Sequence, residues 1–230
     1  EHVEMLKTSA KQLLDQIGQV LDLSSLEAGH LVLQKNAVQL SSFLEELVHL
    51  HRTQAKLKNL ELHLSLDLLL PEWVLADAQR MNQVLSNLLG NALKYTPSGE
   101  VEIVVEPLET VEQLQEQLPH APDDVRMNLQ QVLQASDPKQ VLVLFLVRDT
   151  GVGISHAAQE KVFEEFERGD ASTAVRYGGS GLGLSIALRL AKAMNGWLDV
   201  SSQLGQGSCF SFVLPLQETA GPKTDFHLPL

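Results

Sequence analysis

The chain has 230 residues, of which 44% are hydrophobic, and a net charge of −12. This composition is typical of a folded soluble protein, and the acidic balance argues against a nucleic-acid partner, which would need a basic face. The longest apolar run, residues 141–147, is too short to cross a bilayer, and no signal peptide is visible. A single cysteine, Cys209, excludes an intrachain disulfide and suits a reducing compartment; its strand-like surroundings predict a small buried residue.

Residues 1–28 are predicted to form one helix. Apolar residues recur there every three or four positions, as in a coiled-coil seam, and Gly29 is placed to cap the end. A stripe of this length needs a partner helix. A second copy of the chain is the simplest partner, and the chain's own globular part is the alternative. The chain opens with Glu1-His2 rather than methionine, so we expect a piece of a longer protein.

The next segment alternates between helices and strands. Ser42 and Glu45 form a capping-box pattern that predicts a helix to about residue 58. Residues 60–68 alternate between apolar and polar, which predicts a half-buried strand, and a short strand follows at 73–75. Asp77 is then predicted to cap a helix with its apolar side turned inward.

Two apolar runs, residues 101–105 and 141–147, predict central strands of a sheet. The insert between them, about residues 107–139, has helical spacing broken by prolines. We predict two short helices over one edge of the sheet, which serve either as a structural cover or as a docking surface.

The last part of the chain is predicted to contain two helices and a hairpin. The first helix runs from Gly153 through Phe163 and Phe166, and a polar, glycine-rich stretch separates it from the second. The second helix spans 182–194 and ends at Asn195-Gly196. Strands at 197–201 and 208–214 then form the hairpin, before a tail or linker at 217–230.

These elements together predict an α+β fold. Helices cover one face of a mixed, largely antiparallel sheet, which makes a two-layer α/β sandwich.

The helix after Asp77 carries a polar stripe. Asn87 and Asn91 are four residues apart and share a face, and Lys94 and Tyr95 lie on or beside it. Amide oxygens suit Mg²⁺, a lysine ammonium suits phosphate, and a phenol ring can stack on a flat base. Taken alone, the same residues also fit an ordinary solvated helix face.

A second motif, Asp149-Thr150-Gly151-Val152-Gly153, follows the second apolar strand. A carboxylate at the end of such a strand can accept a hydrogen bond from an exocyclic amine. Gly151 and Gly153 allow the backbone to approach a ligand closely. A plain strand-exit turn is the alternative.

A third motif, residues 178–184, places Gly179, Gly181 and Gly183 at the start of a helix. Backbone N–H groups at a helix start form a seat for an anion. The motif lacks the Rossmann context, because a polar loop rather than a strand precedes it. The chain also lacks the Gly-Lys-Ser/Thr of a P-loop and the His-Arg-Asp of Ser/Thr/Tyr kinases.

The order of these motifs, together with Phe163-Glu164-Glu165-Phe166 and Gly205-Gln206-Gly207, resembles the N, G1, F, G2 and G3 boxes of sensor histidine kinases. The likeness runs from about residue 3 to residue 216, and residues 176–184 especially resemble the hybrid type. It implies the ATPase fold shared with Hsp90, gyrase B and MutL. It also implies part of a dimerisation helix at 1–29, an ATP-binding catalytic domain at 30–216 and a tail or linker at 217–230.

The resemblance implies a role for each site residue. Asn91 would ligate Mg²⁺ with help from Asn87, Lys94 would contact phosphates, Tyr95 would lie near the nucleotide, and Asp149 would accept the adenine amine. The base pocket would be shaped by Gly151 and Gly153. A mobile lid over ATP would span 168–180 and be anchored by Phe163 and Phe166. Phosphate contacts would come from Gly179, Ser180, Gly181, Leu182 and Gly183.

The chain departs from the family in two respects. None of its eight histidines lies in a phosphoacceptor box: His2 precedes Val3-Glu4-Met5 and His156 precedes two alanines. The chain as given is therefore not expected to phosphorylate itself. The histidines are also scattered without ligand spacing, so we expect no histidine metal site. The second departure is the insert, which is longer than the family leads us to expect.

The resemblance implies the catalytic core of a two-component sensor histidine kinase. With ATP and Mg²⁺ as cofactors, it would supply the γ-phosphoryl group to a histidine outside this chain and then to an aspartate of a response-regulator receiver domain. We expect a homodimer or heterodimer through residues 1–28, no nucleic-acid partner and no membrane segment. The expected location is the cytoplasm, as the intracellular part of a membrane-bound sensor. The alternatives are a non-catalytic regulatory module that pairs with another kinase through its helix, and an ATP-driven clamp of the Hsp90 kind.

Overall fold

The computed structural model describes residues 31–135, 137, 139–165 and 181–222. The predicted helix at 1–28, the predicted lid at 168–180 and the end of the tail lie outside these residues. So do three predicted site or anchor residues, Phe166, Gly179 and Ser180.

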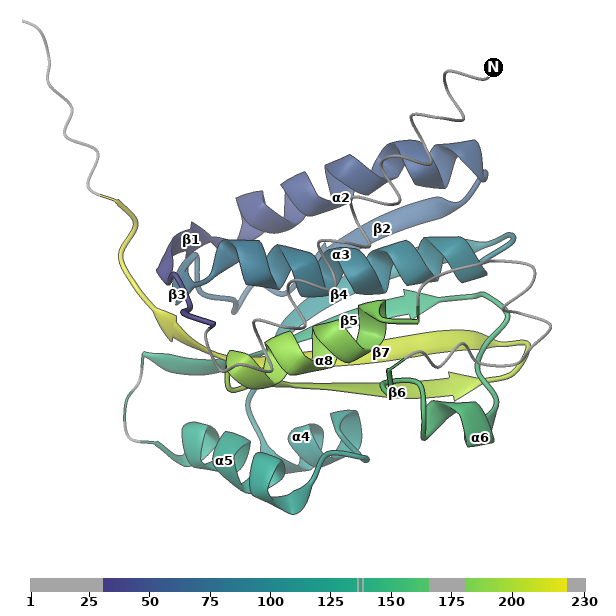
Figure 1. Ribbon diagram of the computed structural model, residues 1–230. Coiled ribbons are helices and arrows are strands. Elements are labelled where there is room, and N and C mark those ends of the chain that lie inside the picture. Colours follow the sequence, from purple (N-terminus) through teal and green to yellow (C-terminus); the bar gives the residue numbers. More distant parts are fainter. Residues whose placement is uncertain (1–30, 136, 138, 166–180, 223–230) are drawn as a thin grey trace, which may run out of the picture.

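A seven-stranded mixed sheet forms the centre of the domain (Figure 1). The strand order is β1-β3-β7-β5-β4-β2, and β6 pairs with β7 beside this path. All pairs are antiparallel except β2 and β4, which run parallel. The sheet is therefore mixed and largely antiparallel, as predicted. The strands are β1 (Asn36–Gln39), β2 (Glu61–Leu66), β3 (Trp73–Ala76), β4 (Glu100–Leu108), β5 (Gln140–Asp149), β6 (Trp197–Gln203) and β7 (Gly207–Glu218).

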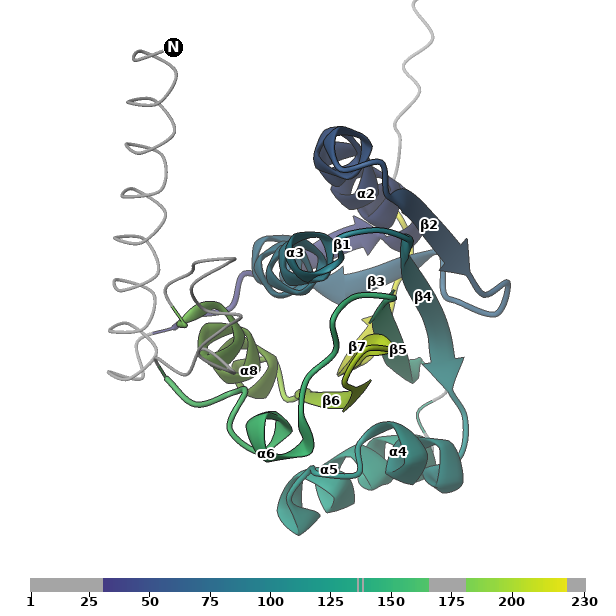
Figure 2. The ribbon, with the colours of Figure 1, turned by 90° about the vertical axis from the view of Figure 1, so that its right-hand side faces the viewer.

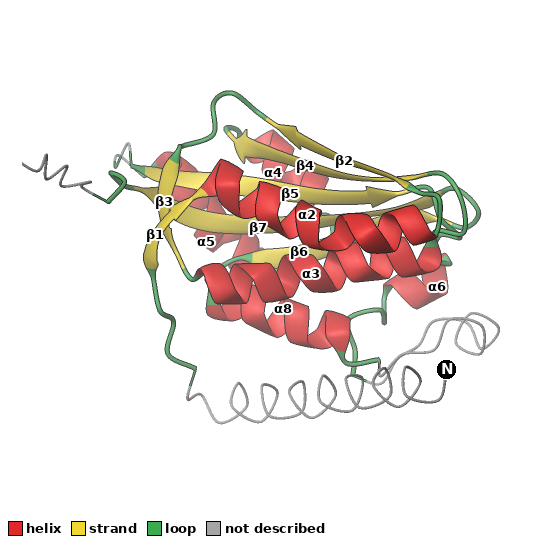
Figure 3. Cartoon of the chain, turned by 90° about the horizontal axis from the view of Figure 1, so that it is seen from above, coloured by secondary structure: helices red, strands yellow, loops and turns green. Residues whose placement is uncertain are grey.

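One face of the sheet is covered by α2 (Leu40–Leu57), α3 (Ala78–Tyr95) and α8 (Gly183–Ala193), with α3 between the other two (Figure 3). Asp77 caps α3 as predicted, because its Oδ1 accepts the N–H of Arg80 at 3.1 Å. The apolar side of α3 packs on the sheet and is fully buried at Leu85 and Leu88. Helices on a mixed sheet confirm the predicted sandwich fold.

The start of α2 differs from the prediction, and the predicted capping box is wrong. The helix begins at Leu40, so Ser42 already lies in its first turn and donates its hydroxyl to Gln39 Oε1 at 2.8 Å. No side chain caps this helix start. Leu40 fixes the start instead, because its side chain is buried and its N–H donates to the carbonyl of Glu72 at 3.1 Å.

The insert lies on the opposite face of the sheet, and the prediction that it covers an edge is wrong (Figure 2). It forms α4 (Val111–Gln117) and α5 (Asp123–Gln134), whose Leu114 and Leu129 are buried in a second apolar core. Alternate residues of β5 point into the two cores, so this strand is covered on both sides. That double burial explains the unbroken apolar run in its sequence. The residues facing the insert are Leu142, Leu144 and Leu146, and those facing the first core are Val143, Phe145 and Val147.

A buried carboxylate fixes the insert to the sheet. Asp199 on β6 is 2% exposed, and its Oδ2 accepts the N–H of His120, in the turn between α4 and α5, at 2.8 Å. Its Oδ1 lies 2.8 Å from Nδ1 of the same histidine and also accepts the N–H of Val200 at 2.8 Å. The turn of the insert is therefore held by several polar contacts as well as by apolar packing.

The helix after Gly153 is much shorter than predicted. α6 spans only His156–Gln159 and is followed by turns that include Phe163. Gln159 ends this helix against the sheet, because its Nε2 donates to the carbonyls of Ile154 and Ser202, each at 2.9 Å. The prediction of a buried Cys209 is also wrong in degree, because the residue is only half-buried, beside the second core.

The second helix and the hairpin form as predicted. After α8, Asn195 adopts a positive φ of 62°, and the N–H of Gly196 bonds to the carbonyl of Ala191 at 2.8 Å. This left-handed residue ends the helix and turns the chain into β6. The hairpin strands are longer than predicted because β7 pairs with β5, β6 and β3 in turn.

Candidate functional site

The polar stripe predicted on α3 exists in the structure. Asn87, Asn91, Lys94 and Tyr95 are all half-buried, whereas the residues between them that face the sheet are buried. The ammonium of Lys94 lies 4.8 Å from the centre of the Tyr95 ring. From Asn87 to Tyr95 the stripe is about 12 Å long, at 1.5 Å per helical residue.

The start of α8 lies directly against one end of this stripe. Asn87 donates its side-chain amide to the carbonyl oxygen of Gly183 at 2.9 Å. A Cβ at Gly183 would be 2.7 Å from Oδ1 of Asn87, closer than two such atoms can pack. Glycine at this position therefore lets the Asn87 side chain keep its place and its bond, and the contact brings the third motif to the first.

The loop after β5 lies against the other end of the stripe. The N–H of Val152 donates to the carbonyl of Tyr95 at 3.2 Å. A Cβ at Gly151 would be 2.5 Å from that carbonyl oxygen and 2.9 Å from the hydroxyl oxygen of Thr96. Because the first of these neighbours is backbone, only glycine fits here. The second motif is thereby placed at the C-terminal end of α3.

Asp149 is positioned within this loop by its own backbone. Its Oδ1 accepts the N–H of Gly151 at 2.8 Å, and the carboxylate is half-buried. Burial raises the pKa of Asp149 above its ordinary value of 3.8, although hydrogen bonds from the backbone of Gly151 and Ser208 act in the opposite direction. A desolvated carboxylate at the end of a strand is suited to recognise a ligand donor rather than to remain solvated.

The β6–β7 turn supports the same loop from outside. The N–H of Gly205 donates to the carbonyl of Val152 at 2.7 Å, and Ser202 Oγ accepts the N–H of Ile154 at 2.8 Å. A Cβ at Gly153 would collide with the carbonyl of Gln203. The hairpin therefore holds Gly153 and its neighbours in place.

The third motif is described from Gly181 onward. Gly181 has a φ of 74°, and Leu182 is buried and precedes the first residue of α8. No side chain caps this helix start. Its N–H groups lie next to Asn87, and a helix start of this kind favours an anion.

Two described residues of the phenylalanine motif, Phe163 and Glu165, contact the rest of the domain. The ring of Phe163 packs edge-on against Phe210, with centres 6.4 Å apart. Glu165 forms an ion pair with Arg189 on α8. Both contacts lie between the first core and α8, which is where the described chain stops before residue 166.

Two residues outside the predicted set also lie at the C-terminal end of the stripe. Thr96 is fully buried and donates its hydroxyl to the carbonyl of Ala92 at 2.7 Å, which places its oxygen beside Gly151. Lys58 donates its ammonium to the carbonyls of Leu93 and Lys94, at 2.7 and 2.9 Å. The position of Thr96 directly after Tyr95 is a sequence signal that could have identified it. Lys58 is too distant in sequence to be linked to α3 by spacing.

The amides of the stripe differ in what they can offer a metal ion. Asn87 already donates its Nδ2 to the carbonyl of Gly183. The Asn91 side chain forms no hydrogen bond with the described part of the chain. An amide oxygen is a suitable ligand for Mg²⁺, which binds through few protein groups and shares phosphate oxygens. Asn91 therefore fits the predicted ligand better than Asn87 does.

A family model described as histidine kinase-, DNA gyrase B- and HSP90-like ATPase matches residues 76–218. This span contains every predicted site residue. The chain belongs to this ATPase family, and within the family it is an ATP-binding catalytic domain of the histidine-kinase type.

Individual relatives agree with this assignment. The signal transduction histidine-protein kinase BarA of Escherichia coli K12 is 35% identical over 216 residues, which are 94% of this chain and 21% of BarA. Hybrid signal transduction histidine kinase K of Dictyostelium discoideum is 33% identical over 214 residues, 93% of this chain and 16% of that protein. The chain thus spans about a fifth or less of these relatives' length.

A solved structure agrees with the fold. The crystal structure of full-length ShkA in complex with AMPPNP has a TM-score of 0.71 and 30% identity, and it covers 96% of this chain and 39% of ShkA. None of the helices that the structure describes in this chain is both long and apolar enough for a membrane span.

Proposed function

We propose that this domain binds Mg-ATP and supplies its γ-phosphoryl group to a histidine outside the chain. The observation that carries the proposal is the meeting of two distant loops on one helix: Gly183 contacts Asn87, and Gly151 contacts the end of α3 at Tyr95. This arrangement joins a carboxylate, a lysine and a helix start along one stripe. The complex of the relative ShkA with AMPPNP supports ATP as the ligand.

The two ends of the stripe have different tasks. At the β5 end, Asp149 accepts the exocyclic amine of adenine, and Tyr95 lies beside the base. At the α8 end, backbone N–H groups from Gly181 to Gly183 bind phosphate oxygens, joined by Gly179 and Ser180. The ammonium of Lys94 adds a positive charge for the phosphates.

Phosphoryl transfer depends on positioning and electrostatic stabilisation more than on covalent chemistry by the protein. Mg²⁺, when bound, neutralises charge on the phosphate oxygens. Asn91 holds that ion through its amide oxygen, and Asn87 supports it while it fixes α8 to α3. The ion pair of Glu165 with Arg189 positions the segment that leads to the lid.

The same proposal includes the partners of the domain. The phosphoryl group passes from the acceptor histidine to an aspartate of a response-regulator receiver domain. Residues 1–28 pair with a second helix in a homodimer or heterodimer. The domain works in the cytoplasm, as part of a longer sensor protein.

Calorimetric titration with Mg-ATP tests the binding step. We expect one site per chain, competition by ADP and weaker binding when EDTA removes the metal. Absence of heat together with absence of ADP competition would instead support the alternative, a regulatory module without nucleotide. Transfer is tested by incubating the chain with labelled ATP and a separate fragment that carries a phosphoacceptor helix; label is expected on the fragment and not on this chain.

A further inference from the structure

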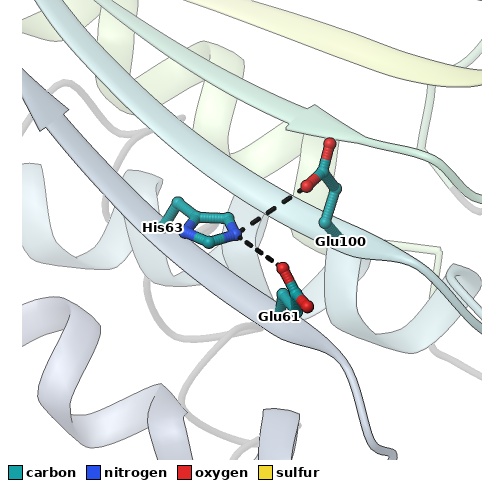
Figure 4. Close-up of side chains that lie close together, drawn as sticks. All are labelled: Glu61, His63 and Glu100. Carbon is teal, nitrogen blue, oxygen red and sulfur yellow. Dashed lines mark hydrogen bonds and ion pairs between the residues drawn. The ribbon is translucent and has the colours of Figure 1, made fainter.

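A histidine and two glutamates, all exposed, converge on β2 and β4 on the face of the sheet opposite α3, away from the nucleotide site (Figure 4). Glu61 and His63 are two residues apart on β2, so their side chains share one face of the strand. Glu100 on β4 pairs directly with Glu61 in the parallel register. The topology therefore creates a three-residue cluster from two separate parts of the chain.

The distances within the cluster match those between ligands of one metal ion. Nε2 of His63 lies 3.2 Å from Oε2 of Glu61 and 3.7 Å from Oε2 of Glu100. A tetrahedral ion with bonds near 2.1 Å holds its ligand atoms about 3.4 Å apart. One ligand atom from each residue lies within 4.8 Å of the others. The three side chains are at least half exposed, so they are free to rotate and close around an ion.

The charge of the surrounding surface favours a cation. Glu102 lies on the same face, next to Glu100, and it already contacts Arg148 at 3.8 Å and Ser65 at 3.2 Å. Within the described part of the chain, His63 is the basic group in contact with Glu61 and Glu100. Two adjacent carboxylates repel each other, and a divalent ion between them would remove that repulsion.

We propose that Glu61, His63 and Glu100 form a binding site for a divalent transition metal of the zinc type, with water in the fourth position. One imidazole nitrogen and two carboxylate oxygens form a ligand set that suits zinc, whereas magnesium prefers oxygen alone. This proposal departs from the sequence-based expectation that the histidines form no metal site, because one of the proposed ligands comes from another strand.

This site is separate from the one that binds Mg-ATP. Side chains alternate along β4 and β5, so Asp149 lies on the face with α3, whereas Glu100 lies on the other face. The two sites still share a hydrogen-bonded strand end, because the N–H of Thr150, next to Asp149, donates to the carbonyl of Glu100 at 3.2 Å.

The test is a calorimetric titration of the whole chain with Zn²⁺, without nucleotide and in a Cys209→Ser background that removes thiol binding. We expect one ion per chain and a loss of affinity of at least about tenfold in His63→Ala, since even changes in residues behind the ligands cost that much. His49→Ala, at an exposed histidine of α2, is the matched control and should leave the affinity unchanged.

Two further measurements complete the test. Glu61→Gln and Glu100→Gln keep the side-chain shape, and each should weaken Zn²⁺ binding while circular dichroism shows an unchanged fold. Co²⁺ bound to the chain should show the strong visible absorption of four-coordinate geometry, and His63→Ala should abolish it. The proposal is overturned if Zn²⁺ does not bind, if His63→Ala binds as tightly as its parent, or if Asn91→Ala removes the zinc site.

Discussion

Asn87 on α3 bonds to the carbonyl oxygen of Gly183 at the first residue of α8, 2.9 Å away, and thereby joins two segments that lie 96 residues apart in sequence. The same bond sets the distance between the polar stripe and the helix start that faces it. Changes at this contact are therefore expected to act on ligand binding more than on the fold.

Gly183→Ala tests that expectation. The added Cβ would lie 2.7 Å from the end of the Asn87 side chain, which can rotate away, so we expect a change in unfolding free energy of less than about 1 kcal/mol. Loss of the Asn87 bond should weaken Mg-ATP binding roughly tenfold, since about 1.4 kcal/mol corresponds to that factor. Chemical denaturation and calorimetry measure the two effects. An equal loss of stability and of affinity, or an unchanged affinity, would contradict the view that this contact acts mainly on ligand binding.

Gly151→Ala should behave in the opposite way. Its Cβ would meet the backbone oxygen of Tyr95 at 2.5 Å, and backbone cannot rotate away. We expect the free energy of unfolding to fall by about 2 kcal/mol or more, the range for forced overpacking. Gly90→Ala on α3 is the control, because nothing lies within 4 Å of a Cβ there. Urea unfolding of both variants compares them.

Asn91→Ala is expected to lower the affinity for ATP only when Mg²⁺ is present. The Asn91 side chain makes no hydrogen bond within the described part of the chain, so its removal should leave thermal stability nearly unchanged. Asn82→Ala, also half-buried on α3, is the matched control. Equal affinities of the Asn91 variant and the parent in magnesium would refute the role of this amide as a metal ligand.

Asp149→Asn separates recognition from stability. Burial raises the pKa of Asp149 in the folded state above its ordinary value of 3.8, so the folded protein binds this proton more tightly than the unfolded chain does. As the pH rises above 3.8, ionisation of Asp149 therefore lowers the free energy of unfolding. The variant cannot ionise, so we expect it to be more stable than the parent at neutral pH and to bind ATP more weakly.

The comparison needs denaturation curves from pH 4 to pH 7 and calorimetry at neutral pH. The stability difference between variant and parent should grow with rising pH until Asp149 is fully ionised. A difference that is constant over this range would show that burial does not disfavour the carboxylate. Unchanged ATP affinity would exclude Asp149 from base recognition.

Leu129→Ala tests the insert as a structural cover. The side chain is 1% exposed in the second core, so truncation should lower the unfolding free energy by about 2–5 kcal/mol. Met127→Ala, on the same helix but 55% exposed, should change it by less than about 0.5 kcal/mol. A small effect at Leu129 would favour the docking role that the sequence left open.

Much of the fold could be predicted because the decisive signals are local. Asp77 before an amphipathic run predicts the start of α3, and alternation predicts β2. The local sequence does not indicate which side of the sheet the insert covers. The apolar run of β5 indicates burial on both faces but does not identify the segment that buries each face. The start of α2 was misplaced because a tertiary bond of Leu40 outweighed a capping pattern at Ser42.

The candidate site shows the same division between local and tertiary information. Motif order predicts Asn91, Asp149 and Gly183 as site residues, because each lies within a short pattern. Other relationships depend on contacts between distant segments. Lys58 contacts the end of α3, 35 residues away in sequence, and Glu100 lies beside Glu61 only because their strands pair. No spacing along the chain encodes either relationship.

The double burial of β5 restricts how such domains can vary. Leu142, Leu144 and Leu146 face the insert and would meet water if α4 and α5 were absent. A homologous domain that lacks these helices must therefore have exchanged all three leucines for polar residues, or else cover them with a bound protein. Among homologous domains, the length of the β4–β5 connection should therefore vary together with the polarity of the β5 residues that face it.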